Sequence, residues 1–101
     1  MFTEVTNVWE SDRLSPEEAL TLQIKAQVMI ELRQIIFSNG WNQAEAAKRL
    51  GITQPRVSYL VNGQVSKFTT DKLLGYISKL GYDFSLNVTK GQPQIETKQV
   101  A

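Results

Sequence analysis

The sequence contains no cysteine and no histidine among its 101 residues. Without cysteine, neither a disulfide bond nor a thiolate zinc site can form. Without histidine, the commonest general base and metal-ligating side chain is missing. These absences exclude metallohydrolases, Ser-His-Asp hydrolases and thiol enzymes, and we expect a protein with no metal, no cofactor and no enzymatic activity.

Long apolar runs are missing as well. Uninterrupted apolar stretches are only a few residues long, whereas a helix needs about 20 apolar residues to span a bilayer. The N-terminal stretch MFTEVTNVWESD lacks the basic and apolar regions of a secretory signal peptide. We therefore expect a cytoplasmic protein without membrane contact.

The composition fits one globular domain, because 42% of the residues are apolar and the chain is of ordinary domain length. The formal net charge is only +1, but it is unevenly distributed. Residues 1–31 hold six acidic and two basic side chains, whereas residues 32–101 hold nine basic and four acidic ones. This split indicates two surfaces with different partners, although a chance split of a near-neutral chain is the alternative.

A long helix is predicted from Pro16 to about Ser38. Ser15 can cap it and Glu18 completes a capping box, with Pro16 at the first helical position. Asn39-Gly40 is a good helix stop. The second half of this helix is apolar on more than one face, so either later parts of this chain wrap it or another chain covers part of it.

Two short helices and a fourth longer one follow. We predict helices over residues 43–50 and 54–61, then a helix that is capped by Thr69 or Thr70 and runs to Leu80. Tyr82, Phe84, Leu86 and Val88 then alternate with polar residues, which predicts a half-buried β-strand over residues 82–89. The polar tail, residues 90–101, is predicted to be disordered.

Residues 43–62 have the pattern of a helix-turn-helix, in which two short helices cross through a tight turn. Ala47 is small enough for a close crossing, and Gly51 allows the positive φ that the turn needs. The predicted buried anchors are Ala46, Leu50, Ile52, Val57 and Leu60. A helical hairpin in an unrelated bundle is the alternative interpretation.

The second short helix would expose Gln54, Arg56, Ser58 and Tyr59. Glutamine can pair bidentately with adenine, arginine with guanine, and serine with either base. This combination favours DNA recognition in the major groove.

The run NQAEAAKRLGITQPRVSYLVNGQVSKFTTDKL closely resembles the XRE/Cro family of helix-turn-helix regulators, and most of all its branch of HigA-type antitoxins. The resemblance covers residues 16 to about 89. It implies a mainly α, lambda-repressor-like bundle with a C-terminal β-strand. It also implies a homodimer that binds a palindromic operator in double-stranded DNA of its own promoter. Many members of that branch neutralise a RelE/HigB-like ribonuclease toxin, and the setting is the bacterial nucleoid or a phage.

The resemblance also assigns roles to individual positions. Family members usually contact a phosphate at the position of Gln43, and Thr53 would cap the recognition helix and touch phosphate as well. Gln54 and Arg56 would contact base edges. The remaining assignments are bases or backbone for Ser58 and Tyr59, a phosphate for Lys67, and either solvent or phosphate for Lys48 and Arg49. Pro55 departs from the usual polar residue and removes one possible base contact, while Phe68 is expected to fill the core.

The predicted strand, residues 82–89, gives an independent argument for a dimer. A lone strand leaves its backbone N–H and C=O groups unpaired, and such an edge invites another chain. Pairing with the same strand of a second copy would use the alternating residues Tyr82, Phe84, Leu86 and Val88 for dimerisation. It could set two recognition helices about 34 Å apart, one turn of DNA. Pairing with residues 2–9, or strand addition to another protein's sheet, are the alternatives.

The acidic arm, residues 1–14, precedes the DNA-binding domain of residues 15–89. Its apolar side chains, Phe2, Val5, Val8 and Trp9, are candidate anchors for a basic toxin. Trp9 could instead pack on its own domain. A stand-alone or phage-type repressor without a toxin partner is the alternative function, and a purely protein-binding adaptor is disfavoured by the polar, arginine-bearing recognition helix.

Overall fold

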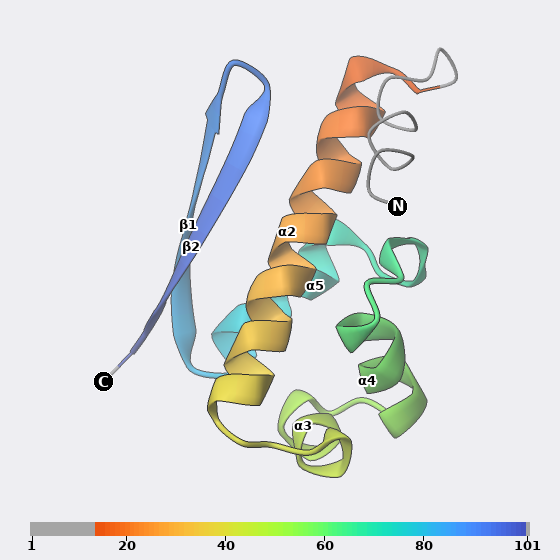
Figure 1. Cartoon of the computed structure of the whole chain (residues 1–101), viewed down its shortest axis with the longest axis vertical. Helices are drawn as coiled ribbons and strands as arrows, with labels where there is room; N and C mark the ends of the chain where they lie inside the picture. The colour runs from red at the N-terminus through yellow and green to blue at the C-terminus, as the bar shows by residue number, and fades with distance from the viewer. Residues whose placement is uncertain (1–13, 101) are drawn as a thin grey trace.

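A computed structural model describes residues 14–100 of the chain. In this range the chain forms four α-helices, one short 3-10 helix and a two-stranded antiparallel sheet, which agrees with the predicted mainly helical fold (Figure 1). None of the helices in this part of the chain has the length and hydropathy to cross a membrane. The elements are α2 (Pro16–Ser38), α3 (Gln43–Leu50), α4 (Gln54–Val61), η1 (Val65–Lys67), α5 (Thr70–Lys79), β1 (Tyr82–Thr89) and β2 (Gln92–Gln99).

The start of α2 is fixed by the predicted capping box. The Glu18 backbone N–H donates to Ser15 Oγ at 3.1 Å, and the Ser15 backbone N–H donates to Glu18 Oε1 at 2.9 Å. These two bonds satisfy amide donors that have no partner inside the helix. The helix ends at Ser38, and Gly40 follows with a φ of 71°. The predicted bounds of α2 are therefore confirmed.

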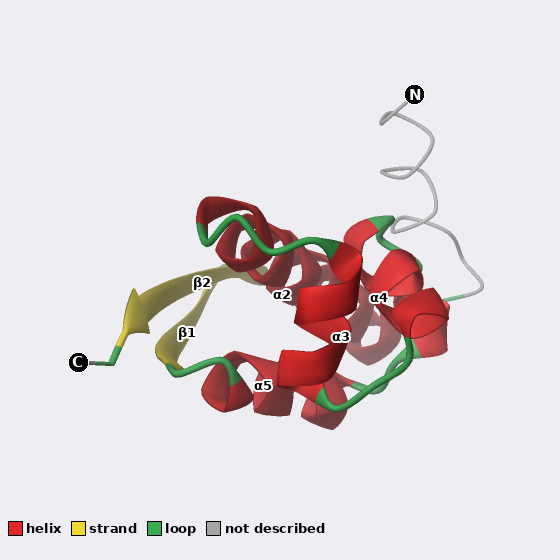
Figure 2. Cartoon of the chain, turned by 90° about the horizontal axis from the view of Figure 1, so that it is seen from below, coloured by secondary structure: helices red, strands yellow, loops and turns green. Residues whose placement is uncertain are grey.

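The core lies between α2 and the three later helices. Its largest fully buried side chains come from all four helices, and Figure 2 shows α3, α4 and α5 gathered around one side of α2. Phe68, which follows η1, is also buried and meets Tyr76 of α5 edge to face, with 6.1 Å between ring centroids. The core position expected for Phe68 is thus confirmed. The fully buried set is Val28, Leu32, Ile36, Leu50, Val57, Leu60, Leu73 and Ile77.

The C-terminal residues form a second strand, so the prediction of disorder over residues 90–101 is wrong for Gln92–Gln99. β2 pairs antiparallel with β1 in a register that joins Tyr82 to Gln99 and Thr89 to Gln92. The two strands are joined by Lys90 and Gly91, both with positive φ (54° and 73°), as a two-residue hairpin turn requires. The strand of residues 82–89 is therefore not a lone strand, and residues 92–99 cover one of its edges.

β2 packs against α2 along the side opposite the helical core (Figure 1). Pro93 and Ile95 are buried there, and polar contacts flank them. Gln27 Nε2 donates to the Pro93 carbonyl at 2.6 Å, and Thr97 Oγ1 donates to Glu31 Oε1 at 2.9 Å. A single isoleucine, a proline and two polar contacts therefore join this mostly polar strand to α2, in addition to its pairing with β1.

The many-sided apolar character of α2 is thus explained mainly by this chain itself. One side of α2 faces α4 and α5, and a second side faces β2. A third face stays open among the described residues, because Ile30 and Phe37 are 53% and 58% exposed. Wrapping within the chain accounts for two of the three faces.

The contact of β2 with α2 can be tested with Ile95→Ala. Ile95 is only 8% exposed, and removing a buried isoleucine side chain typically costs about 2–4 kcal/mol. We expect a loss of this size in the free energy of unfolding, measured by urea denaturation. Glu96→Ala, on the exposed face of the same strand, is the control and should change stability by less than about 0.5 kcal/mol. Equal, small effects of the two substitutions would contradict the observed packing.

Candidate nucleic-acid interface

α3 and α4 form the predicted helix-turn-helix. Asn42 caps α3, since its Oδ1 accepts the Glu45 backbone N–H at 2.8 Å. Gly51 ends α3 in the left-handed conformation, with φ 71° and ψ 33°. Thr53 then caps α4, with its Oγ1 accepting the Arg56 N–H at 3.4 Å, and Pro55 lies in the first turn, where no intrahelical N–H is needed. The turn geometry therefore follows from local sequence signals.

The inner faces of the two helices are locked into the core. Ala46, Ala47 and Leu50 of α3 are buried, as are Val57 and Leu60 of α4. Ile52, in the turn, is half-buried and packs against the same core. Because the inner face is fixed by packing, the outer face of α4 is held in one orientation relative to α3.

The outer face carries the side chains that were predicted to contact DNA. Gln43 begins α3, while Thr53 and Gln54 lie at the start of α4, and all three are exposed. A helix N-terminus binds phosphate oxygens well, but in the first turn of α4 Pro55 has no N–H and the Arg56 N–H already bonds to Thr53. Further along α4, Ser58 and Tyr59 are half-buried, and Lys67 is exposed in the loop that follows. The structure therefore brings the predicted set together around α4.

Arg56 has a more constrained environment than the sequence suggests. Its guanidinium carbon lies 4.5 Å from the centroid of the Phe68 ring, and its Nη2 donates to the Lys67 carbonyl at 3.1 Å. The side chain thus joins α4 to the loop that contains η1. A guanidinium has five N–H donors, so others stay available beside this one bond.

Two further contacts order the same surface. Lys67 Nζ lies 4.9 Å from the centroid of the Tyr59 ring, a cation–π geometry. Asn62 Nδ2 donates to the Ser58 carbonyl at 2.8 Å and to Ser58 Oγ at 3.2 Å. The Ser58 hydroxyl accepts in this contact and can still donate its own proton. The Lys67 ammonium, the Tyr59 ring and the Ser58 hydroxyl are therefore each held in place by a neighbouring side chain.

Lys48 and Arg49 of α3 differ in their surroundings. Arg49 Nε lies 2.8 Å from Glu45 Oε2, and its guanidinium stacks 4.3 Å from the Trp41 ring centroid. Both side chains are exposed, but the Arg49 charge is partly compensated by Glu45 within α3, whereas Lys48 forms no ion pair within residues 14–100. Of the two, Lys48 is the better candidate for a phosphate contact.

Lys79 was not singled out from the sequence. Its Nζ lies beside the turn between α3 and α4, because a Cβ placed on Gly51 would be only 3.0 Å from it. The ammonium is therefore close to the C-terminal end of α3, where the helix dipole favours a positive charge. No local signal could have found this contact, because the two residues are far apart in the chain and only the packing of α5 brings them together.

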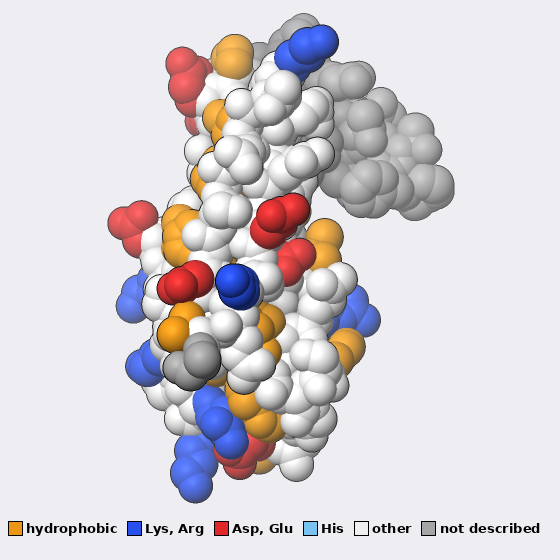
Figure 3. Space-filling model, turned by 90° about the vertical axis from the view of Figure 1, so that its left-hand side faces the viewer, with side chains coloured by type: hydrophobic (Ala, Val, Ile, Leu, Met, Phe, Trp, Pro, Cys, Tyr) orange, Lys and Arg blue, Asp and Glu red, His pale blue; other side chains and the backbone are white. Residues whose placement is uncertain are grey.

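The part of the chain that contains this surface is basic. Residues 32–82 contain seven basic and two acidic side chains. Figure 3 views the molecule from the hairpin side, where most of the visible Lys and Arg side chains lie in the lower half, and the surface around α4 is on the far side. The remaining predicted sites lie elsewhere: Tyr82, Phe84, Leu86 and Val88 are on β1, and the arm residues Phe2, Val5, Val8 and Trp9 lie outside the described residues.

Comparisons with known proteins agree with this geometry. A family model described as a helix-turn-helix domain matches residues 11–89. A solved chain named "Putative XRE Family Transcriptional Regulator" is 33% identical, with a TM-score of 0.65, and the match covers 71% of this chain and 81% of that one. Comparison with curated proteins gave no match. The protein therefore belongs to the XRE-type family of helix-turn-helix transcriptional regulators, which bind DNA.

Proposed function

We propose that this regulator binds a palindromic operator as a homodimer and represses its own promoter. The observation that carries the proposal is the first turn of α4. There an exposed glutamine, Gln54, stands on a helix whose other face is locked into the core. A recognition helix enters the major groove with its N-terminal residues against base edges. Gln54 has the bidentate amide that reads adenine.

The other contacts divide between phosphates and bases. Gln43 and Thr53, at the two helix N-termini, suit phosphates on either side of the groove. Lys67 suits a third phosphate beside the loop. Ser58 and Tyr59 reach bases or backbone further along α4. Phosphate contacts set the register of the protein on the duplex, and base contacts set the sequence that it reads.

Arg56 takes two roles in this proposal. One N–H bonds to the Lys67 carbonyl and fixes the loop, and the remaining donors turn toward guanine O6 and N7. Because the ring of Phe68 supports the guanidinium plane, less side-chain freedom is lost when DNA binds.

Arg56→Ala and Lys67→Ala should separate base reading from phosphate binding. Loss of the arginine should weaken operator binding by about 1–3 kcal/mol and relax the preference at one base pair. Loss of the lysine should weaken all sequences similarly and lower the salt dependence of binding. Fluorescence anisotropy with operator variants at several salt concentrations measures both, and thermal unfolding checks that each variant is folded. An equal loss on every sequence for Arg56→Ala would refute its assignment as a base reader.

The dimer is proposed to form through β1. Its edge opposite β2 is unpaired within the described residues. Phe84 and Leu86 are 36% exposed and Val88 is 47% exposed, on the face that β2 turns toward α2. Antiparallel pairing of β1 with its copy would join two hairpins into one sheet and cover these side chains. Tyr82 contributes less, because it is half-buried and its hydroxyl already accepts a bond from Asn39 Nδ2 at 3.2 Å.

Leu86→Glu tests this dimer without removing the strand that covers α2. A charge in the centre of the apolar strip should cost about 2 kcal/mol or more of association free energy. We expect sedimentation velocity to show a shift from dimer to monomer, together with weaker operator binding. Phe37→Glu, at an exposed position on α2, is the matched control and should leave the dimer intact. A Leu86→Glu protein that sediments as a stable dimer would disprove the β1 interface.

The antitoxin role is the second part of the proposal. Support comes from the acidic N-terminal third of the sequence, which suits a basic RelE/HigB-like toxin, and from the resemblance to HigA-type antitoxins. Phe2, Val5, Val8 and Trp9 would be the apolar anchors of that contact. The cytoplasm of a bacterium, or a phage that infects one, is the setting this implies.

Two observations distinguish an antitoxin from a stand-alone or phage-type repressor. An adjacent reading frame that encodes a short basic protein is expected for an antitoxin. Co-purification of that protein should then depend on the arm, and Trp9→Ala should reduce the captured amount because a central aromatic anchor is lost. Glu17→Ala, at an exposed position of α2, is the control. Absence of such a gene would favour the stand-alone repressor.

A further inference from the structure

The two long edges of the β1–β2 hairpin differ in the backbone groups that they offer. Just before β1 begins, the Gly81 carbonyl accepts the Val100 backbone N–H at 2.9 Å. Along an antiparallel pair, hydrogen-bonded and non-hydrogen-bonded residue pairs alternate, and a residue of the second kind points its N–H and C=O groups away from the neighbouring strand. By this alternation, the residues of β1 that bond to β2 are Asp83, Ser85, Asn87 and Thr89.

The free edge of β1 therefore belongs to its apolar residues. The residues whose N–H and C=O groups point away from β2 are Tyr82, Phe84, Leu86 and Val88. Residues 83–89 are all exposed, and no further strand of residues 14–100 bonds to this edge. A strand that pairs here would satisfy these backbone groups and would also lie beside the apolar side chains of the same residues.

The outer edge of β2 is blocked. By the same alternation, its outward backbone groups begin at Pro93, which has no N–H to donate. The Pro93 carbonyl already accepts a hydrogen bond from Gln27 Nε2 at 2.6 Å, and Pro93 and Ile95 are buried against α2. Pairing of β1 with β2 of the next copy, which would continue into an open-ended chain of molecules, is hindered in this way. The hairpin therefore has one edge on which a strand of another molecule can add.

We propose that β1 pairs antiparallel with β1 of a second copy in a single register, about a twofold axis at Ser85. This inference rests on the proposed homodimer and fixes how its two strands are aligned. Residues opposite each other in an antiparallel pair lie on the same face of the sheet, so apolar positions must meet apolar ones. With the axis at Ser85, Tyr82 lies opposite the partner subunit's Val88, and Phe84 lies opposite the partner subunit's Leu86.

This register gives every outward backbone group of β1 a partner. The two strands then share about eight hydrogen bonds, whereas moving the axis by one residue, to Phe84 or Leu86, leaves about six. An axis between two residues would set apolar residues against polar ones. On the opposite face of the sheet, Asp83 lies opposite the partner subunit's Asn87, so no like charges meet.

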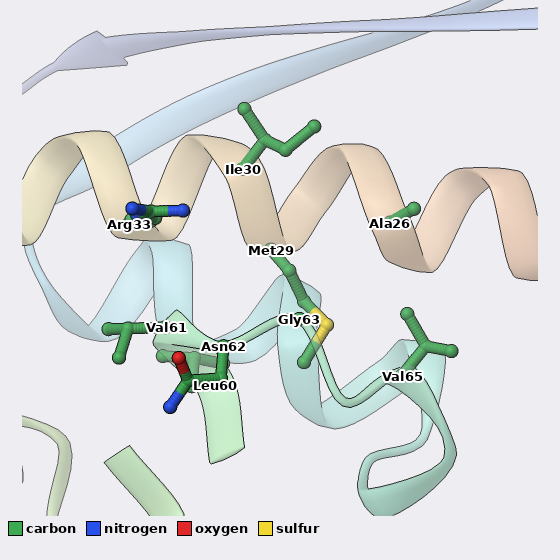
Figure 4. A pocket seen from close by; sticks show the side chains of 9 residues that line it. All are labelled: Ala26, Met29, Ile30, Arg33, Leu60, Val61, Asn62, Gly63 and Val65. Carbon is green, nitrogen blue, oxygen red and sulfur yellow. The ribbon is translucent and has the colours of Figure 1, made fainter. Parts of the chain in front are cut away.

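The groove between α2 and the segment that joins α4 to η1 is the alternative place for a second copy. Its volume is about 310 Å³, and Figure 4 shows Met29 reaching from α2 toward Val65 and the turn at Gly63. The groove lies on the side of α2 away from the hairpin (Figure 1), so a copy bound there would leave β1 unpaired. Its lining residues come from helices and a turn, not from a strand edge, and so need no backbone partners.

Ser85→Cys tests the register in the full chain, which has no cysteine of its own. The two introduced thiols would face each other in a non-hydrogen-bonded pair, with about 4.5 Å between Cα atoms, a distance that a disulfide can bridge. We expect most of the protein to run at dimer mass on a non-reducing gel after mild oxidation. Asn87→Cys is the matched control, because it is also exposed on the same face of β1. Its two copies would lie about 14 Å apart along the strands, so it should stay at monomer mass.

A mixed experiment checks the same register from the other positions. An Asp83→Cys chain and an Asn87→Cys chain of different mass, unfolded and refolded together, should cross-link to each other and not to themselves. A dimer in sedimentation velocity that Ser85→Cys fails to link, or linkage by Asn87→Cys alone, would overturn the register and leave the proposed dimer standing. A chain that sediments as a monomer would refute both. A dimer that also survives Leu86→Glu would place the second copy elsewhere, with the groove as the first site to test.

Discussion

The burial of α2 is the constraint on which the other elements depend. Val28, Leu32 and Ile36 of this helix lose nearly all solvent contact only because α4, α5 and β2 pack around them. Burial of apolar area is the main favourable term in folding. The orientation of α4, and with it the proposed DNA-reading surface, is therefore set by a helix that is itself not predicted to touch DNA.

Local signals in the sequence predicted most of this fold. The capping box at Ser15, the cap at Thr53 and the positive φ at Gly51 each depend on neighbouring residues, so the helix bounds could be predicted correctly. β2 could not, because its sequence QPQIETKQ has one large apolar residue and its other face meets solvent. The Lys90-Gly91 turn was the available sign of a hairpin, but it lacks the Asn or Asp that makes such turns easy to recognise.

The candidate site was predictable as a set of residues but not as a set of contacts. The sequence indicated which side chains of α4 would face outward. It could not show that Arg56 rests on Phe68, that Lys67 lies over Tyr59, or that Lys79 lies beside Gly51, because each contact depends on how η1 and α5 pack. The first two contacts join α4 to the loop after it, and the third joins α5 to the turn before α4.

The hairpin also has a consequence for the order of folding during synthesis. The bonds from Gln27 to Pro93 and from Thr97 to Glu31 each join residues 66 positions apart. A chain grows from its N-terminus at about 5–20 residues per second. The side of α2 that β2 covers therefore stays bare for seconds after the helix has left the ribosome. During that interval this side of α2 is exposed to solvent. It is covered only when residues 92–99 have emerged and paired with β1.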